Sequence, residues 1–313
     1  MLTFDKLKIV TSINNININN ETLFTQKVIN ETIITKKYSV KSPYNLEIEL
    51  NYENYELVVE FSGKILGKDY PQLISQRTIR QCFDNINALG VCSLDVEAIL
   101  NDAYVVKCDV TTDIDCDNAT GLTSFINANV ISHKKYLCQQ LPNGNFIIEK
   151  NVTTKGCKKR LTIYDKNKEM NKTDNRRYME CYDIQGDEFD GKVRLEMNLN
   201  TQEQIRKALN LCDNNLSSVL NAQTNPIADF LDDILADTPA WRPTSKKEYE
   251  AMLVLQANDN DIEAVEATLR QICGSKFHPQ RDLTPYREML ARGNTRPEFS
   301  KSTLIEQIRS VSN

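Results

Sequence analysis

The chain has 313 residues, of which 40% are hydrophobic and 26% charged, and its formal net charge is −5. This length can form one large domain or two ordinary ones, each with its own core. The acidic balance excludes a protein that binds nucleic acid through a global excess of positive charge, so any anion-binding surface must be local.

The cysteines and histidines indicate a reducing compartment and argue against a zinc site. Nine cysteines are scattered without a C-x-x-C pair, and the only histidines are His133 and His278. A thiolate and imidazole zinc site is therefore not expected. Unpaired cysteines fit a reducing cytoplasm. The start MLTFDKLKIV lacks a signal-peptide core, and no apolar run approaches the ~20 residues that span a bilayer, so we expect a cytoplasmic chain without a membrane partner.

The first two thirds of the chain read mainly as β-strands. Alternating or β-rich runs predict strands over 4–13, 37–42, 46–52, 55–63, 103–111, 134–140, 144–152, 158–165 and 191–199. Helical spacing predicts helices over 75–89, 94–100 and 119–130, and Asn143-Gly144 predicts a turn between two strands. The sequence thus predicts an α+β fold in which a mostly antiparallel sheet is packed with helices.

After residue 200 the segments are helix-like, and we place a boundary near residue 215. Residues 1–215 would form the α+β domain and residues 216–313 a helical C-terminal domain. Two readings of the helical region stay open: a bundle that only packs or dimerises, or a helix-turn-helix-like reader of DNA. The second would use cations such as Arg270, Lys276, Arg281, Arg287 and Arg292.

A local excess of positive charge surrounds one tyrosine. Between residues 155 and 177 nine cations face three acids, although the whole chain is acidic. Such a run is either a solvated face or a surface that contacts phosphates. The residues we assign to DNA binding are Lys155, Lys158, Lys159, Arg160, Lys168 and, from a later strand, Arg194.

Tyr164 lies at the end of the predicted strand 158–165. Residues two apart on a strand share a side, so Lys166 would lie beside Tyr164. A phenol is a weak nucleophile that needs nearby positive charge or a metal, and Lys166 could supply the charge. The alternative is a half-buried aromatic residue with an exposed hydroxyl. Tyr178 and Tyr182 are rival nucleophiles, or packing residues on one helix face.

Carboxylates on predicted strands are the candidate metal ligands. They are Asp109, Glu196 and Glu60, whose hard oxygens suit Mg²⁺ or Mn²⁺. The alternative is that each is a separate surface residue, and only convergence on Tyr164 would make them a site.

Four segments in order, VVEFSGKIL, VVKCDVT, KRLTIYDKNKE and GKVRLEMNL, resemble phage and plasmid replication proteins of the gene II and X type. The resemblance covers roughly residues 1 to 210, and its core is Tyr164-x-Lys166-x-x-Glu169 followed by Arg194-x-Glu196. It implies a rolling-circle initiator that nicks and rejoins one strand at a plasmid or phage origin through a 5′-phosphotyrosine. Tyr164 would be the nucleophile, and Asp109, Glu196 and, less closely, Glu60 would hold the metal.

The implied partners are origin DNA, a host helicase and polymerase, and a second copy in a homodimer. The chain lacks the two-histidine metal motif of many other rolling-circle enzymes, and the stretch after Glu196 has no tyrosine. Three other functions stay open: a non-catalytic DNA-binding module, a mobilisation relaxase, and a structural protein.

Overall fold

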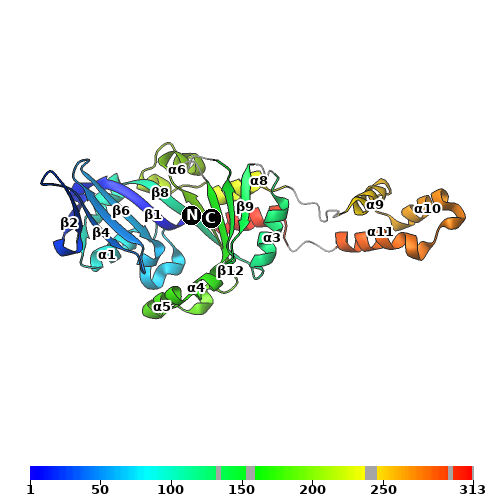
Figure 1. The fold of residues 1–313 in the computed structure, drawn as a ribbon, viewed down its shortest axis with the longest axis horizontal. Helices are drawn as coiled ribbons and strands as arrows, with labels where there is room; N and C mark the ends of the chain where they lie inside the picture. The colour runs from blue at the N-terminus through cyan, green and yellow to red at the C-terminus, as the bar shows by residue number, and fades with distance from the viewer. Residues whose placement is uncertain (132–134, 153–158, 237–244, 295–298, 312–313) are drawn as a thin grey trace. The chain divides into compact units, whose positions relative to one another are not determined.

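A ten-stranded antiparallel sheet organises most of the chain (Figure 1). The computed structural model describes residues 1–131, 135–152, 159–236, 245–294 and 299–311, with only the backbone for 291–294. The sheet order is β3-β4-β5-β6-β1-β8-β12-β11-β10-β9. The predicted α+β class is confirmed. The strands are β1 (Thr3–Ser12), β3 (Thr25–Ile29), β4 (Thr32–Val40), β5 (Leu46–Asn51), β6 (Glu56–Ser62), β8 (Tyr104–Asp115), β9 (Tyr136–Gln140), β10 (Phe146–Lys150), β11 (Arg160–Asp165) and β12 (Lys192–Leu199).

The sheet has two halves with the same strand order. In the first half β1 is followed by β3 to β6, and β6 returns to pair with β1. In the second half β8 is followed by β9 to β12, and β12 returns to pair with β8. The long strands β1 and β8 pair at the centre. Polar residues from β1, β8, β12 and β11 can therefore meet on one face.

The other face of these central strands forms a core. Leu7, Val110 and Leu195 are fully buried, as their alternation with polar neighbours requires. Burying each such side chain contributes about 1.5–3 kcal/mol. Several helices contact β1, β8 or β12, among them α2 (Val96–Asp102), α6 (Gln202–Leu209), α7 (Leu216–Leu220) and α8 (Pro226–Ile234).

The segments next to the polar face of the central strands form a small hydrophobic core of their own. They are the 3₁₀ segment η3 (Gly63–Gln72), α4 (Lys166–Met170), α5 (Thr173–Tyr182) and the 3₁₀ turn η5 (Gly186–Phe189). Tyr70, Met170, Tyr178 and Phe189 pack together there and are all buried. This cluster holds η3 and α4 against each other and so fixes the residues described below. The remaining elements of this part are η1 (Ile13–Asn15), β2 (Ile16–Ile18), η2 (Glu21–Leu23), α1 (Ile79–Ala88), β7 (Cys92–Leu94) and α3 (Ala119–Asn129), and β2 and β7 form a separate two-stranded sheet.

Contacts divide the chain into two compact units, residues 1–235 with 304–313, and residues 236–303. The division after Leu235 lies later than the predicted position near residue 215. The reason is that α7 contacts β8, and α8 contacts β8 and β12, so both helices belong to the sheet unit. Helix α12 (Lys301–Val311) also joins it from Leu304 onward, and there the Gln307 amide donates to the Asp115 carbonyl at 2.7 Å.

We expect Ile308→Ala to destabilise the sheet unit by about 2–5 kcal/mol, because it empties a fully buried position on α12. Urea unfolding of the full chain measures the change. Val311→Ala, at a half-exposed position of the same helix, is the control and should stay within about 0.5 kcal/mol. Equal effects of the two substitutions would show that α12 is not packed as described.

The second unit contains α9 (Lys246–Ala257), α10 (Ile262–Cys273), the 3₁₀ turn η6 (Gly274–Lys276) and α11 (Pro279–Asn294). Leu255, Val265 and Leu283 are among its buried residues. Arg270 pairs with Glu266 and Arg281 with Asp282, each at 2.6–2.7 Å. The Arg292 side chain lies outside the described residues.

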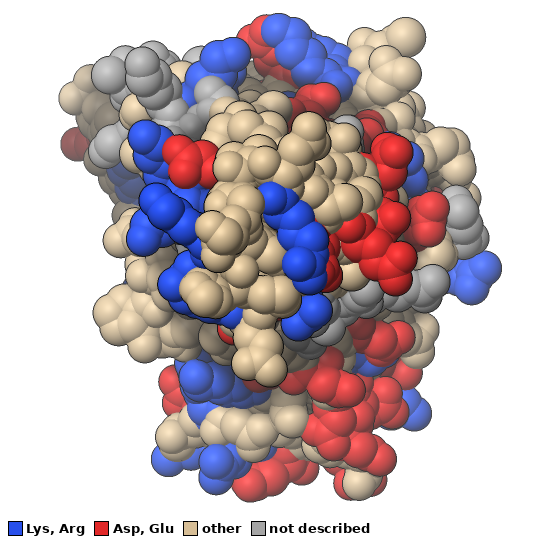
Figure 2. Space-filling model, turned by 90° about the vertical axis from the view of Figure 1, so that its right-hand side faces the viewer, with Lys and Arg blue, Asp and Glu red and all other residues tan. Residues whose placement is uncertain are grey.

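The surface charge is mixed on the face that Figure 2 shows, where lysines and arginines lie beside Asp and Glu patches. A uniformly basic surface, as a DNA-reading helix would favour, is not seen on the coloured part of that face. No helix among the described residues combines the length and apolarity needed to cross a bilayer.

Candidate functional site

Tyr164 lies near the end of β11, two residues before α4 begins. Asp165 ends the strand and caps the helix, since its carboxylate accepts from the Lys168 backbone N–H at 2.8 Å. Lys166 is therefore the first residue of a helix and not, as predicted, the next residue on Tyr164's side of a strand. Its ammonium nevertheless lies 5.7 Å from the Tyr164 ring centroid. The two residues are brought together by the turn of the chain.

The Tyr164 hydroxyl donates a hydrogen bond to the Glu196 carboxylate. Strand pairing explains the contact, because Thr162 lies opposite Glu196 and Tyr164 opposite Arg194 on β12. Burial, followed by the charge of Asp5, raises the pKa of Glu196 to about 7. Burial and then Glu196 raise the pKa of Tyr164 well above its usual value. A phenol bonded to a carboxylate that titrates near neutrality is an acid and base pair.

Arg194 is the buried centre of the site. It is fully buried, and its guanidinium bonds both oxygens of Asp113 at 2.6 Å and Asp5 at 2.9 Å. Burial alone would raise the pKa of Asp113, but Arg194 lowers it overall. Arg194 was predicted to contact DNA. The structure instead places it beneath the surface, where it holds two carboxylates in position.

Asp5 and Tyr70 complete the cluster, and the sequence did not point to either. Asp5 lies in a register irregularity of β1 between Phe4 and Lys6, and its N–H donates to Thr111 Oγ1 at 3.1 Å. The Tyr70 hydroxyl, on η3, donates to Asp5 at 3.3 Å. Neither a bulge nor a returning 3₁₀ segment has a strong signal in one sequence.

Lys166 is the second buried cation of the site. It is 2% exposed, and its ammonium donates to the Tyr70 hydroxyl at 2.7 Å. Burial and then Arg194 lower the pKa of Lys166 to about 8. The site thus places two cations among three carboxylates, Asp5, Asp113 and Glu196. A charged group that forms or binds in this site would therefore lie close to fixed side chains of opposite charge.

The predicted metal ligands share a sheet face but not one cluster. Asp109 pairs with Asn198, two residues from Glu196 on β12, and accepts from the Asn198 amide at 2.7 Å. Burial raises the pKa of Asp109. Glu60 lies on β6, three strands from β12, where it pairs with Lys6 and with Lys8 at 3.1 Å. The lysines lower the Glu60 pKa despite burial.

A divalent cation could be held only by single carboxylates of this set. Burial is the main cause of the raised pKa values of Asp109 and Glu196, and a cation bound to either carboxylate would offset its charge. Glu60 does not fit, since two lysines already neutralise it. Among the described residues no three Asp, Glu, His or Cys side chains form a group that could hold a metal.

The predicted DNA contacts fall into three groups. Lys155 and Lys158 lie outside the described residues. Lys159 and Arg160 are half-buried, and burial lowers the pKa of Lys159. Lys168 is exposed and lines a pocket beside Tyr164, so of these residues it is the best placed to meet a phosphate.

The rival tyrosines have other partners. The buried Tyr178 hydroxyl donates to the carbonyls of Lys64 and Gly67 at 2.8 and 2.9 Å. The Tyr182 hydroxyl pairs with that of Tyr44. Neither hydroxyl contacts a carboxylate in the described part of the chain, so neither has a base to activate it.

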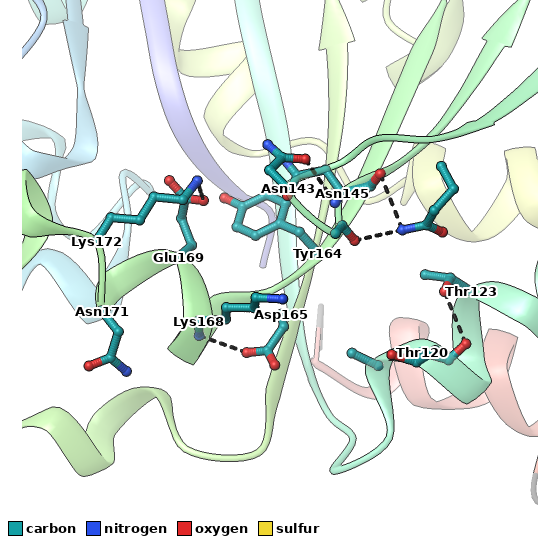
Figure 3. Close-up of a pocket in the computed structure, with 13 residues that line it drawn as sticks. Thr120, Thr123, Asn143, Asn145, Tyr164, Asp165, Lys168, Glu169, Asn171 and Lys172 are labelled. Atoms are coloured by element: carbon teal, nitrogen blue, oxygen red, sulfur yellow. Dashed lines mark hydrogen bonds and ion pairs between the residues drawn. The ribbon is translucent and has the colours of Figure 1, made fainter.

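A pocket of about 260 Å³ opens against the Tyr164 ring (Figure 3). In the close-up the ring lies between the hairpin residues Asn143 and Asn145 and the α4 residues that include Glu169. Residues at the start of α3 also line the pocket. A ligand in this pocket would lie beside the tyrosine. Its lining is Ala119, Thr120, Thr123, Gln140, Asn143, Gly144, Asn145, Tyr164, Asp165, Lys168, Glu169, Asn171 and Lys172.

Comparisons with protein-family models, with curated proteins and with solved structures each found no match.

Proposed function

We propose that the chain is a DNA strand nickase and transferase of the rolling-circle initiator type, with Tyr164 as its nucleophile. The observation that carries the proposal is the hydrogen bond from the Tyr164 hydroxyl to Glu196 beside an open pocket. A phenol with its own base next to a pocket meets the first geometric requirement for covalent catalysis. Origin recognition and the rolling-circle role rest on the resemblance of the four segments.

The proposed step transfers a DNA phosphoryl group to the phenol. A bond forms between Tyr164 Oη and phosphorus, the bond between phosphorus and O3′ breaks, and Glu196 takes the phenolic proton. Lys166 donates its own proton to O3′, so the site gives up one proton and takes up one. The products are a 5′-phosphotyrosine and a free 3′ hydroxyl that a host polymerase can extend. In the reverse step a 3′ hydroxyl attacks the phosphotyrosine and rejoins the strand without an external energy source.

Positive charge around the phenol stabilises the transition state. Lys166, near the Tyr164 ring, offsets charge that builds on the phosphoryl oxygens. Arg194 fixes Asp5 and Asp113, so it acts through these residues and not on DNA. Mg²⁺ or Mn²⁺, if held by Asp109, would neutralise the phosphodiester and leave Glu196 to take the phenolic proton. Helicase, polymerase, a homodimer and a cytoplasmic location are part of the same proposal.

The direct test incubates the full chain with a supercoiled replicon and Mn²⁺ and separates covalent protein–DNA products under denaturing conditions. Nicking with protein attached to a 5′ end supports the proposal. Salt-sensitive DNA binding without nicking under any divalent ion would favour a non-catalytic module. Absence of both would favour a structural protein.

We expect the nicking rate to have a bell-shaped pH dependence with its maximum between about pH 7 and pH 8. The rate rises as Glu196, with a pKa of about 7, loses its proton and becomes a base. It falls as Lys166, with a pKa of about 8, loses the proton it must donate. The two groups lie in one cluster, so the two limbs belong to the pair. A single-turnover rate measured across pH tests this, and a flat profile would contradict the assignment of both roles.

A further inference from the structure

The pocket beside Tyr164 has the lining of a site for one unpaired nucleobase. At about 260 Å³ it is slightly smaller than the ~300–1,000 Å³ of pockets that bury drug-sized ligands, so it suits a single base. Its walls carry carboxamides, hydroxyls and one aromatic face, that of Tyr164. Bases taken out of a duplex are recognised by such hydrogen-bonding groups and by stacking.

The hairpin between β9 and β10 presents the carboxamides. The Gln140 amide donates to the Gly144 carbonyl at 2.9 Å, and Asn143 Oδ1 accepts from the Asn145 N–H at 3.1 Å. These two bonds hold the hairpin in shape. The Asn145 carboxamide makes no hydrogen bond within the described part of the chain, so its donor and its acceptor are both open to a ligand. Asn145 is one of the residues that line the pocket (Figure 3).

Lys168 supplies an unneutralised cation at the same place. The Lys168 ammonium lies against the hairpin turn at Gly144, where φ is +91°. A side-chain Cβ at this glycine would be only 3.4 Å from the ammonium nitrogen. The neighbouring Lys172 is paired with Glu169. No described acidic side chain pairs with Lys168. A phosphate beside the pocket would therefore meet Lys168 while the base meets Asn145.

We propose that this pocket binds one unpaired nucleotide next to the scissile phosphate and that Asn145 selects adenine. A single carboxamide can bond adenine bidentately, through its N6 amino group and N7. On the corresponding edge guanine offers two acceptors, cytosine one donor and thymine one acceptor, so only adenine pairs with both the donor and the acceptor of Asn145. Lys168 holds the adjoining phosphate without regard to sequence. The part of this proposal that places the nucleotide next to a scissile phosphate rests on the proposed nickase function. The preference for adenine can be measured without DNA cleavage.

The test uses the Tyr164→Phe protein, which cannot cleave, and short single strands of each of the four bases, with affinity measured by fluorescence anisotropy. The adenine strand should bind about tenfold more tightly than the others, as expected for one bidentate base contact. Asn145→Ala in the same background should reduce this preference to about twofold or less and leave binding of the other strands unchanged. Lys168→Ala should weaken all four strands alike and lower the salt dependence.

Asn54→Ala, in the exposed turn between β5 and β6, is the matched control and should change nothing. Equal affinity for the four strands, or an adenine preference that survives Asn145→Ala, would overturn the proposal. If the adenine preference depends on Asn145 but the wild-type chain does not nick DNA, the assignment of the pocket is supported and the proposed nickase function is contradicted.

Discussion

Tyr164→Phe should lower the rate of strand nicking by about a thousandfold or more, with no covalent protein–DNA product, because the substitution removes the attacking oxygen. The ring itself stays, so the wall of the pocket and the single-strand affinity should be kept. A gel assay on supercoiled DNA measures nicking, and anisotropy measures binding.

Tyr182→Phe is the matched control for this loss. It removes a hydroxyl that bonds only Tyr44 among the described residues, and it should nick at close to the wild-type rate. If Tyr182→Phe is inactive and Tyr164→Phe is active, the nucleophile lies on α5 and the site described above has another role.

Arg194→Met should destabilise the fold by about 3–5 kcal/mol, since removing one partner of a buried ion pair leaves uncompensated charge. Among the described residues, Arg194 is the only cation that bonds directly to Asp5 and Asp113, and both carboxylates would lose it. Urea unfolding at neutral pH measures the loss. Arg309→Met, which breaks a half-exposed pair with Asp229, should cost less than about 1 kcal/mol.

A second substitution separates buried charge from lost packing. Adding Asp113→Asn to Arg194→Met removes one of the stranded carboxylates and should restore part of the stability. An Arg194→Met protein as stable as the wild type would contradict the buried cluster altogether.

Periodicity predicted most of the sheet, because its central strands have one buried and one polar face. It did not predict β3, whose residues are all exposed and so show no alternation of buried and polar positions. The runs 46–52, 55–63 and 191–199 correspond to β5, β6 and β12, and the Asn143-Gly144 turn joins β9 to β10. Strand order depends on pairing between residues far apart in the sequence, which alternation does not specify. The two equivalent halves of the sheet were therefore visible only in the structure.

Within the site, the sequence identified the residues whose neighbours are close along the chain or across one strand pair. Tyr164, Lys166 and Glu196 do come together. Asp5 was missed because a bulge turns it toward the cluster, and Tyr70 because η3 brings it back. Burial could not be judged either, since an arginine that bonds phosphate and one that bonds two aspartates look alike in sequence.

The most direct measurement of the central claim is the identity of the residue that carries DNA after cleavage. The covalent product is trapped, digested with protease and nuclease, and its peptides are examined by mass spectrometry. We expect the residual nucleotide on Tyr164, in the peptide that runs into α4. A nucleotide on Tyr178, Tyr182 or any other residue would contradict the proposed mechanism.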